Sequence, residues 1–350
     1  MEKSFSDHIV EILEVTEDNP ALKDLLLNMF FSNPPGSVSR NIKKILDTYQ
    51  LKPRAKSGWS CQHKGCDKKS CASHEVSENA VLKNICSLDS SVVILKKDIK
   101  DNPIFFVEGR QHKRNATNFP GYCSEHDAAL FSDIDSSDTP FDIHYVNKQC
   151  LRTTRAQIFE MDLQIKASEI FISDVPESIR NDGEVIEVIR HFNDKKTGLE
   201  LKRQRLWDVY NKIFDGIESK NYVLKFESFP TGAAGFCFTA CVDLTKDEEE
   251  DPCIIYACKL DLKSSSETFV AYLDNAISKK MFDDFTRCHQ ISFGLLMYTL
   301  KSKLIFSENF ASYISADVKE VLYKDEELYP VGPIQHYFIS TAFFSNPTEP

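Results

Sequence analysis

Apolar residues recur at helical spacing in several parts of the chain. In residues 5–50 they stand three and four positions apart, with a break at residues 33–36 (Asn-Pro-Pro-Gly), which predicts two or three helices. The same spacing over residues 147–171 and 181–219 predicts two long helices. A further helix is expected near residues 315–323.

Shorter runs rich in β-branched and aromatic residues predict strands between these helices. The runs cover residues 91–95, 104–108, 222–226, 235–242, 253–260, 268–273 and 291–298. Because helices and strands come in blocks and do not alternate, the pattern predicts an α+β fold. We expect an N-terminal helical segment (1–55), a small central module (56–135) and a larger C-terminal α+β domain (141–350) for sensing, partner binding or oligomerisation.

Composition places the chain among ordinary globular proteins, with one qualification about charge. Of its 350 residues 42% are hydrophobic and 27% charged, and the net charge is -11. So acidic a balance argues against a nucleic-acid partner, because phosphates are neutralised by Lys and Arg. Residues 51–126, however, hold 13 Lys or Arg against 8 Asp or Glu, which gives +5 there and -16 for the rest. The net negative charge therefore does not exclude a nucleic-acid partner and only restricts which part of the chain could bind it.

The first fifteen residues do not look like a secretory signal. They include Glu2, Asp7, Glu11 and Glu14, where a signal peptide needs an uninterrupted apolar core. No stretch approaches 18 apolar residues without charges, so we expect a cytoplasmic protein with no membrane partner. In that reducing compartment the 11 Cys are not expected to form a disulfide framework.

Two short Cys/His pairs predict a metal site. Cys61 and Cys66 form one pair, and Cys123 and His126 form the other about fifty residues later. Three thiols and one imidazole suit tetrahedral Zn²⁺ in a closed, structural site that would join the two ends of the intervening segment. Cys71 has the same spacing from Cys66 as Cys66 has from Cys61, so it is an alternative ligand.

Four later cysteines could form a second metal site, but their surroundings favour another interpretation. Cys237 and Cys241 lie in one predicted strand, and Cys253 and Cys258 lie in the next. Cysteine behaves as a small hydrophobic residue in buried strands. We therefore predict that these four side chains belong to the core.

Two motifs near the first Cys/His pairs resemble a known family. One is Ser73-His-Glu-Val-Ser, and the other is Asn118-Phe-Pro-Gly-Tyr-Cys-Ser-Glu-His-Asp127. Together they resemble the HNH nucleases, also called ββα-metal or His-Me finger nucleases, and in particular a bacterial subgroup. The resemblance implies a zinc-stapled ββα-metal module in which His74, Asn118 and Asp127 occupy the catalytic places.

The chemistry of those places is that of a metal-dependent phosphodiesterase acting on DNA or RNA. His74 would be the general base, Asn118 would orient it, and Asp127 would hold a catalytic Mg²⁺ or Mn²⁺. One departure from the family pattern is Ser73, which stands where an acidic metal ligand is usual. In bacteria such nucleases often serve as effectors in defence against phage, which the resemblance suggests for this chain.

Two other interpretations remain open. The Cys/His site could build a non-catalytic interaction module, or the chain could be one subunit of a defence complex. DNA or RNA would bind through the basic segment 51–126, and a protein partner or a second copy through the acidic C-terminal domain. The basic residues that flank the candidate site are Lys52, Arg54, Lys56, Lys64, Lys68, Lys69, Arg110, Lys113 and Arg114.

Overall fold

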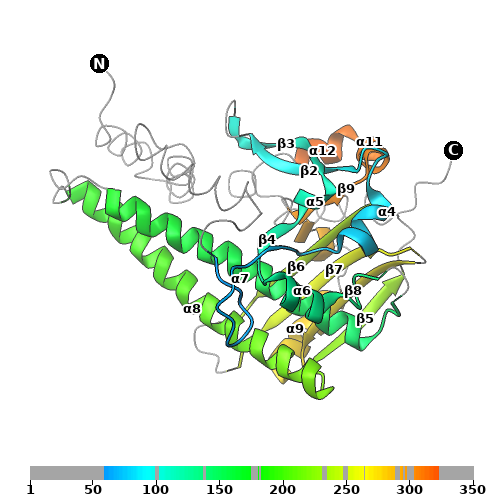
Figure 1. Cartoon of the computed structure of the whole chain (residues 1–350). Helices are drawn as coiled ribbons and strands as arrows, with labels where there is room; N and C mark the ends of the chain where they lie inside the picture. The colour runs from blue at the N-terminus through cyan, green and yellow to red at the C-terminus, as the bar shows by residue number, and fades with distance from the viewer. Residues whose placement is uncertain are drawn as a thin grey trace.

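The computed structural model (Figure 1) describes most of residues 59–322. The described residues are 59–98, 102–136, 139–174, 180, 183–230, 235–246, 251–263, 265–287, 292–294, 296–297 and 303–322. The predicted N-terminal helical segment, residues 1–55, lies outside them, as do Lys52, Arg54 and Lys56.

A seven-stranded sheet runs through the molecule in the order β3-β2-β9-β6-β7-β8-β5, and all its neighbouring strands are antiparallel. Its strands are β2 (Ser91–Asp98), β3 (Asn102–His112), β5 (Leu224–Pro230), β6 (Phe236–Asp243), β7 (Ile254–Asp261), β8 (Ser266–Leu273) and β9 (Ile305–Phe306). Helices flank the sheet on both sides (Figure 1), so the chain mixes helix and sheet in agreement with the predicted α+β class.

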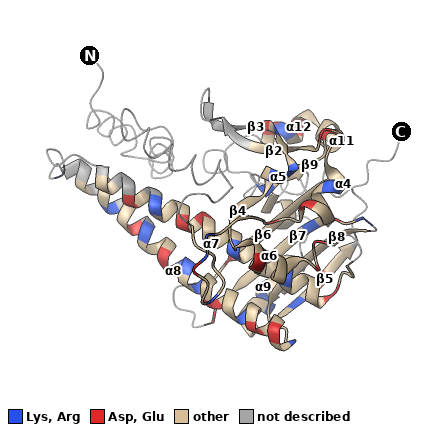
Figure 2. Ribbon diagram, in the orientation of Figure 1, with Lys and Arg blue, Asp and Glu red and all other residues tan. Residues whose placement is uncertain are grey.

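Two long helices, α7 (Ile143–Asp174) and α8 (Gly183–Ser219), lie side by side and extend past the sheet (Figure 1). They match the helices predicted at 147–171 and 181–219. Lys and Arg alternate with Asp and Glu along α8 (Figure 2), as expected for a helix with one solvated face. None of the helices in the described part of the chain is long and apolar enough to cross a membrane.

The sheet buries side chains on both faces. In β7, Tyr256 and Cys258 pack in the core shared with α6, α7 and α8, while Ile255 and Ala257 pack in a second core. That second core holds α9 (Ala276–Arg287), α11 (Glu308–Tyr313) and α12 (Ala316–Leu322). The alternation follows from the two-residue period of a strand.

The four cysteines interpreted as core residues are buried. Cys237, Cys241 and Cys258 lie on the sheet face toward α7 and α8, and Cys253, just before β7, is 1% exposed. They do not gather into a metal-binding group among the described residues. The prediction of a core role is confirmed.

One predicted strand is wrong. Residues 292–294 and 296–297, within the expected strand 291–298, are helical. Phe293 and Met297 are both buried in the core that contains α9. A spacing of four puts two side chains on one side of a helix, whereas a short apolar run by itself does not distinguish helix from strand.

A second, two-stranded sheet pairs β1 (Ala72–His74) with β4 (Asn118–Pro120), and α6 (Ser124–Phe131) follows directly. Between the two strands the chain forms a π-helical turn η2 (Glu78–Leu82), α4 (Lys83–Ile85), β2, β3 and α5 (Lys113–Ala116). The predicted module 56–135 thus supplies two strands of the large sheet as well as the whole small one.

A buried carboxylate ties the small sheet to the large one. Glu75, directly after β1, accepts a hydrogen bond from Thr239 of β6 (2.8 Å) and pairs with Lys303 (2.7 Å). Its backbone carbonyl accepts one from Gln149 of α7 (2.9 Å). Charges buried in this way persist only when they are paired and hydrogen-bonded. These contacts fix the position of β1, and with it His74, on the rest of the molecule.

Candidate metal centre and adjoining polar site

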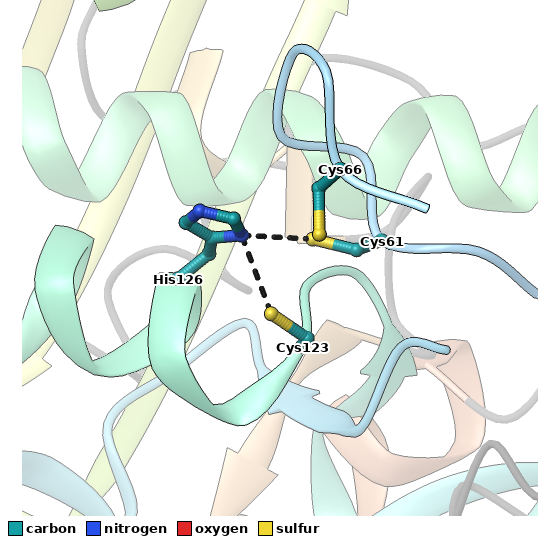
Figure 3. A group of neighbouring side chains, drawn as sticks. All are labelled: Cys61, Cys66, Cys123 and His126. Atoms are coloured by element: carbon teal, nitrogen blue, oxygen red, sulfur yellow. Dashed lines mark hydrogen bonds between the residues drawn. The ribbon is translucent and has the colours of Figure 1, made fainter. Parts of the chain in front are cut away.

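The first Cys/His pair sits on a tight turn. The amide of Cys61 donates to the Lys68 carbonyl (2.7 Å), and the amide of Cys66 donates to the His63 carbonyl (3.0 Å). Gly65 has φ +78°, a left-handed conformation that glycine adopts without cost. The turn brings the two sulfur atoms to the same side of the loop (Figure 3).

The second pair begins α6. Cys123 caps this helix and His126 lies in its first turn. The His126 ring points Nδ1 toward the sulfur atoms of Cys61 (3.4 Å) and Cys123 (3.3 Å) (Figure 3). The ligand atoms of all four residues, Cys66 included, lie within 4.8 Å of one another. The structure therefore brings together the four residues that the spacing predicted.

The donor set suits a metal ion. Three sulfur atoms and one imidazole nitrogen around a common centre match the preference of Zn²⁺ for four soft or borderline ligands. Burial raises the pKa of Cys61 to about 11. Burial is also the largest single effect on Cys123, but hydrogen bonds from the backbone amides of His126 and Glu125 and from the thiols of Cys61 and Cys66 together outweigh it, so the pKa of Cys123 is lowered. A thiolate at the start of a helix is stabilised in this way.

Cys71, the alternative ligand, is not a member of this group. Its amide donates to the carbonyl of Tyr122 (2.6 Å), one residue before the second pair. Burial raises the pKa of the Cys71 thiol, and the neighbouring charge of Asp127 acts in the same direction. Because burial raises the pKa of Cys61 as well, it is the positions of the sulfur atoms that make Cys61 and Cys66 the better pair.

His74 and Asn118 face each other across the small sheet. They are register partners at the end of β1 and the start of β4, so their side chains share one face. The His74 side chain is 21% exposed, with its Nδ1 3.5 Å from the Thr117 hydroxyl. Burial lowers the pKa of His74, while the charge of Glu78 acts to raise it. The imidazole is therefore neutral at pH 7 and can accept a proton.

Asp127 and Asn118 each present a buried oxygen with no partner. Neither Oδ1 atom accepts a hydrogen bond from any residue in the described part of the chain. Burial raises the pKa of Asp127, although the charge of Arg152 and the hydroxyl of Ser73 oppose the effect. Buried oxygens without donors are uncommon and suit a cation ligand.

The Ser73 hydroxyl of β1 hydrogen-bonds the Asp127 carboxylate. His74 and Asp127 share electrostatic neighbours, because the charges of Arg152 and Asp135 act on the pKa of both. Arg152 donates to both carboxylate oxygens of Asp135 at 2.9 Å, while its Nε has no partner among the described residues.

No family model, curated protein or solved structure matches this chain. The chemistry of the site therefore has to carry any assignment of function.

Glu78 is a residue of this site that the sequence analysis did not single out. One carboxylate oxygen lies 3.7 Å from His74 Nε2, and the other lies 3.7 Å from Lys113 Nζ and 3.5 Å from Arg114 Nε. The spacing of four from His74 was visible in the sequence, together with Ser77, whose side chain caps the turn. Lys113 and Arg114 come from α5, which no local pattern connects with Glu78.

The other basic residues of the segment differ in their availability. Lys68 pairs with Glu125 (2.6 Å), and Arg110 pairs with Asp89 (3.0 Å) and with Glu308. Lys64 and Lys69 are exposed on the turn that carries the first pair. The exposed charge of Lys64 and Lys69 on the turn is therefore more available than that of α5, where Lys113 and Arg114 share the Glu78 carboxylate.

Proposed function

We propose that this protein is a metal-dependent phosphodiesterase of the HNH type, acting on DNA or RNA. The observation that carries the proposal is the pairing of His74 with Asn118 on a two-stranded sheet that runs directly into a helix bearing Cys123, His126 and Asp127. The order strand, strand, helix agrees with the ββα order that the sequence resemblance implies, and it supports the proposal.

Each residue has a role that its surroundings support. Neutral His74 would accept the proton of the attacking water, and Asn118, its register partner on β4, would orient the imidazole in the reacting complex. Asp127 and the unpartnered amide oxygen of Asn118 are hard donors of the kind that bind Mg²⁺ or Mn²⁺. A divalent cation bound there would offset negative charge on the phosphate and the leaving oxygen. Lys113 and Arg114 are placed to contact the substrate backbone.

We assign zinc to the Cys61, Cys66, Cys123 and His126 group as a structural ion. The purified protein should contain one zinc per chain by elemental analysis. Cys66→Ser should lose it, because three ligands do not close a structural site. Cys71→Ser is the matched control and should keep it. Zinc retained in Cys66→Ser and lost in Cys71→Ser would reverse the choice of ligands.

Cleavage is tested on the full chain with supercoiled and linear DNA, single-stranded DNA and RNA, each with Mg²⁺ and with Mn²⁺. His74→Ala should lower the rate by about 10²- to 10⁴-fold, the usual contribution of a general base. His144→Ala is the control, since that imidazole pairs with Asp133 and Tyr222 away from the small sheet. Equal rates in the wild type and His74→Ala would refute the role of His74.

A scaffold without catalysis is the competing proposal, and one observation favours it. Cys61 and Cys123 belong to the same buried core as Tyr210 and Ile213 of α8, so the ion would stabilise that core whether or not His74 reacts. A zinc-loaded wild type that cleaves no nucleic acid, alone or with co-purified partners, supports the scaffold. For the role in phage defence, the wild type but not His74→Ala should protect bacteria from infection.

A further inference from the structure

Arg155 on α7 is a buried charge without a hydrogen bond. Its side chain is 0% exposed, and Nε, Nη1 and Nη2 donate to no residue that the structure describes. Arg152, three residues earlier, is 1% exposed but is neutralised by the two bonds to Asp135. An isolated buried charge costs several kcal/mol unless another charge compensates it. Arg155 therefore needs a counter-charge that its hydrogen bonds do not reveal.

The acidic neighbour of Arg155 is distant and already shared. Asp162 Oδ2 lies 4.0 Å from Nη1, while Oδ1 of the same carboxylate pairs with Arg203 at 3.0 Å. The guanidinium carbon lies 5.4 Å from the centre of the Trp207 ring. A cation over an aromatic face gains some energy, but the contact does not neutralise the charge.

A series of ring contacts connects Trp207 with the metal centre. Trp207 contacts Tyr210, and Tyr210 stacks on Phe214 along α8. Phe214 meets the edge of His63, which stacks on the ligand His126 at 3.8 Å. The hydroxyl of Tyr210 lies 2.8 Å from that of Tyr122, the residue before the ligand Cys123.

Electrostatics within the protein point the same way. Burial lowers the pKa of Arg155, and the charges of Tyr122, Asp162, Tyr210 and Cys61 act in the opposite direction. The charge of Cys61, the first metal ligand, is the smallest of these influences on the guanidinium, and it acts in the same direction as the others.

The metal-loaded centre would carry the negative charge that balances the Arg155 guanidinium. Three thiolates and a neutral imidazole around Zn²⁺ carry a net charge of about -1. We propose that Arg155 is the counter-charge of the metal-loaded Cys61, Cys66, Cys123 and His126 group, and that it couples α7 to metal binding. The inference concerns the metal centre alone and does not depend on phosphodiesterase activity.

The test compares Arg155→Met with the matched control Arg152→Met in the full chain, zinc-loaded and stripped by a chelator. Zinc affinity is measured by competition with a chromophoric chelator, and stability by thermal unfolding. Arg155→Met should weaken zinc binding by about 10- to 100-fold, as the loss of outer-sphere partners does. The metal-free form of this variant should be at least as stable as metal-free wild type, since a buried unpaired charge has been removed.

Arg152→Met should instead destabilise both forms alike and leave zinc affinity unchanged. Arg155→Lys keeps the charge and should retain most of the zinc affinity, which covers the case in which Arg155→Met folds poorly. If metal-free wild type is itself unfolded, the zinc concentration that restores folding is compared among the variants. Equal loss of stability in both forms of Arg155→Met with unchanged zinc affinity, or a wild type that binds no zinc, would overturn the proposal.

Discussion

At His74 two influences act on one imidazole in opposite directions. Burial disfavours the charged ring and lowers its pKa, while the Glu78 carboxylate 3.7 Å away favours the charged ring. Because burial is the larger effect, the folded pKa lies below the ordinary value of 6.5. The imidazole is thus kept neutral at physiological pH, which is the form that the proposed role of general base requires.

Because the pKa of His74 in the folded protein lies below 6.5, the fall of the cleavage rate with decreasing pH should have its midpoint below pH 6.5. Glu78→Gln removes the charge that raises the pKa of His74, so the decline should move to still lower pH. Glu308→Gln, which changes an exposed carboxylate on α11, should not move it. Rate profiles from pH 5 to 8 measure the shift, and a wild-type midpoint above 6.5 would contradict the prediction.

Asp127 and Asp135 make a contrasting pair of carboxylates. Burial raises the folded pKa of Asp127 above its ordinary value of 3.8. The protonated carboxyl therefore contributes to the free energy of unfolding at low pH, and this contribution is lost as pH rises through the folded pKa. Asp127→Asn should therefore leave stability at pH 7 unchanged or higher, while activity falls by about 10- to 100-fold for want of a cation ligand.

Asp135→Asn should do the opposite to stability. It breaks the paired bonds with buried Arg152 and should lower the free energy of unfolding by about 2 to 3 kcal/mol. Urea unfolding of both variants at pH 7 gives the comparison. A marked loss of stability in Asp127→Asn would mean that its carboxylate serves the fold and not a cation.

The residues of the candidate site were predictable to different degrees. The four ligands follow from short spacings, because each pair sits within one turn of the chain. Glu78 and Arg155 gave no such signal, since their importance depends on Lys113, Asp162 and Trp207, which only the folded chain brings near them. Local patterns thus reveal ligands within a turn, while charge compensation across the fold has to be read from the structure.

Among the elements, the turn that carries Cys61 and Cys66 depends most clearly on backbone conformation. Gly65 has φ +78° and open space where a Cβ would be added. Any cost of substitution there comes from the left-handed backbone and not from crowding.

Gly65→Val should therefore lower stability by about 1 to 2 kcal/mol and weaken zinc binding, whereas Gly65→Asn should be tolerated. Gly198 in α8 is the matched control, because a Cβ there also meets nothing within 4 Å. With ordinary helical backbone, Gly198→Ala should stabilise the protein by up to about 1 kcal/mol. Thermal unfolding with zinc titration decides the matter, and equal behaviour of Gly65→Val and Gly65→Asn would contradict the backbone argument.

The order of strands could not be predicted from the sequence, although most strands could. The runs at 91–95, 235–242 and 253–260 fall within β2, β6 and β7, give or take a residue at the ends. Strand β9 pairs with both β2 and β6 and so joins them, but it has only two residues. Two residues are too few to show the apolar–polar alternation by which a strand is predicted. The run at 291–298 was misassigned because a short, mostly apolar run does not by itself distinguish a helix from a strand.

At the scale of the whole molecule, charge is unevenly placed. The chain is acidic overall, with a net charge of -11, yet exposed Lys64 and Lys69 and the α5 pair Lys113 and Arg114 surround the candidate site. Nucleic acid would approach on this side.

Binding should therefore weaken steeply with salt, and Arg114→Ala should reduce the slope of log affinity against log salt by about 1. Lys212→Ala, which removes an exposed charge on α8, should leave the slope unchanged. Fluorescence anisotropy with a labelled oligonucleotide and a catalytically inactive His74→Ala background provides the measurement. Equal slopes in Arg114→Ala and Lys212→Ala would place the contact surface elsewhere.

The short strand β9 decides whether residues 56–135 can exist by themselves. A fragment ending at residue 140 would lose Phe306, the register partner of Val93, and would expose an apolar strand edge. It would also leave Glu75 buried without Thr239 and Lys303. Such a fragment should self-associate before it binds any metal. The candidate site should therefore form only in the whole chain, and not in residues 56–135 expressed alone or inserted into another protein.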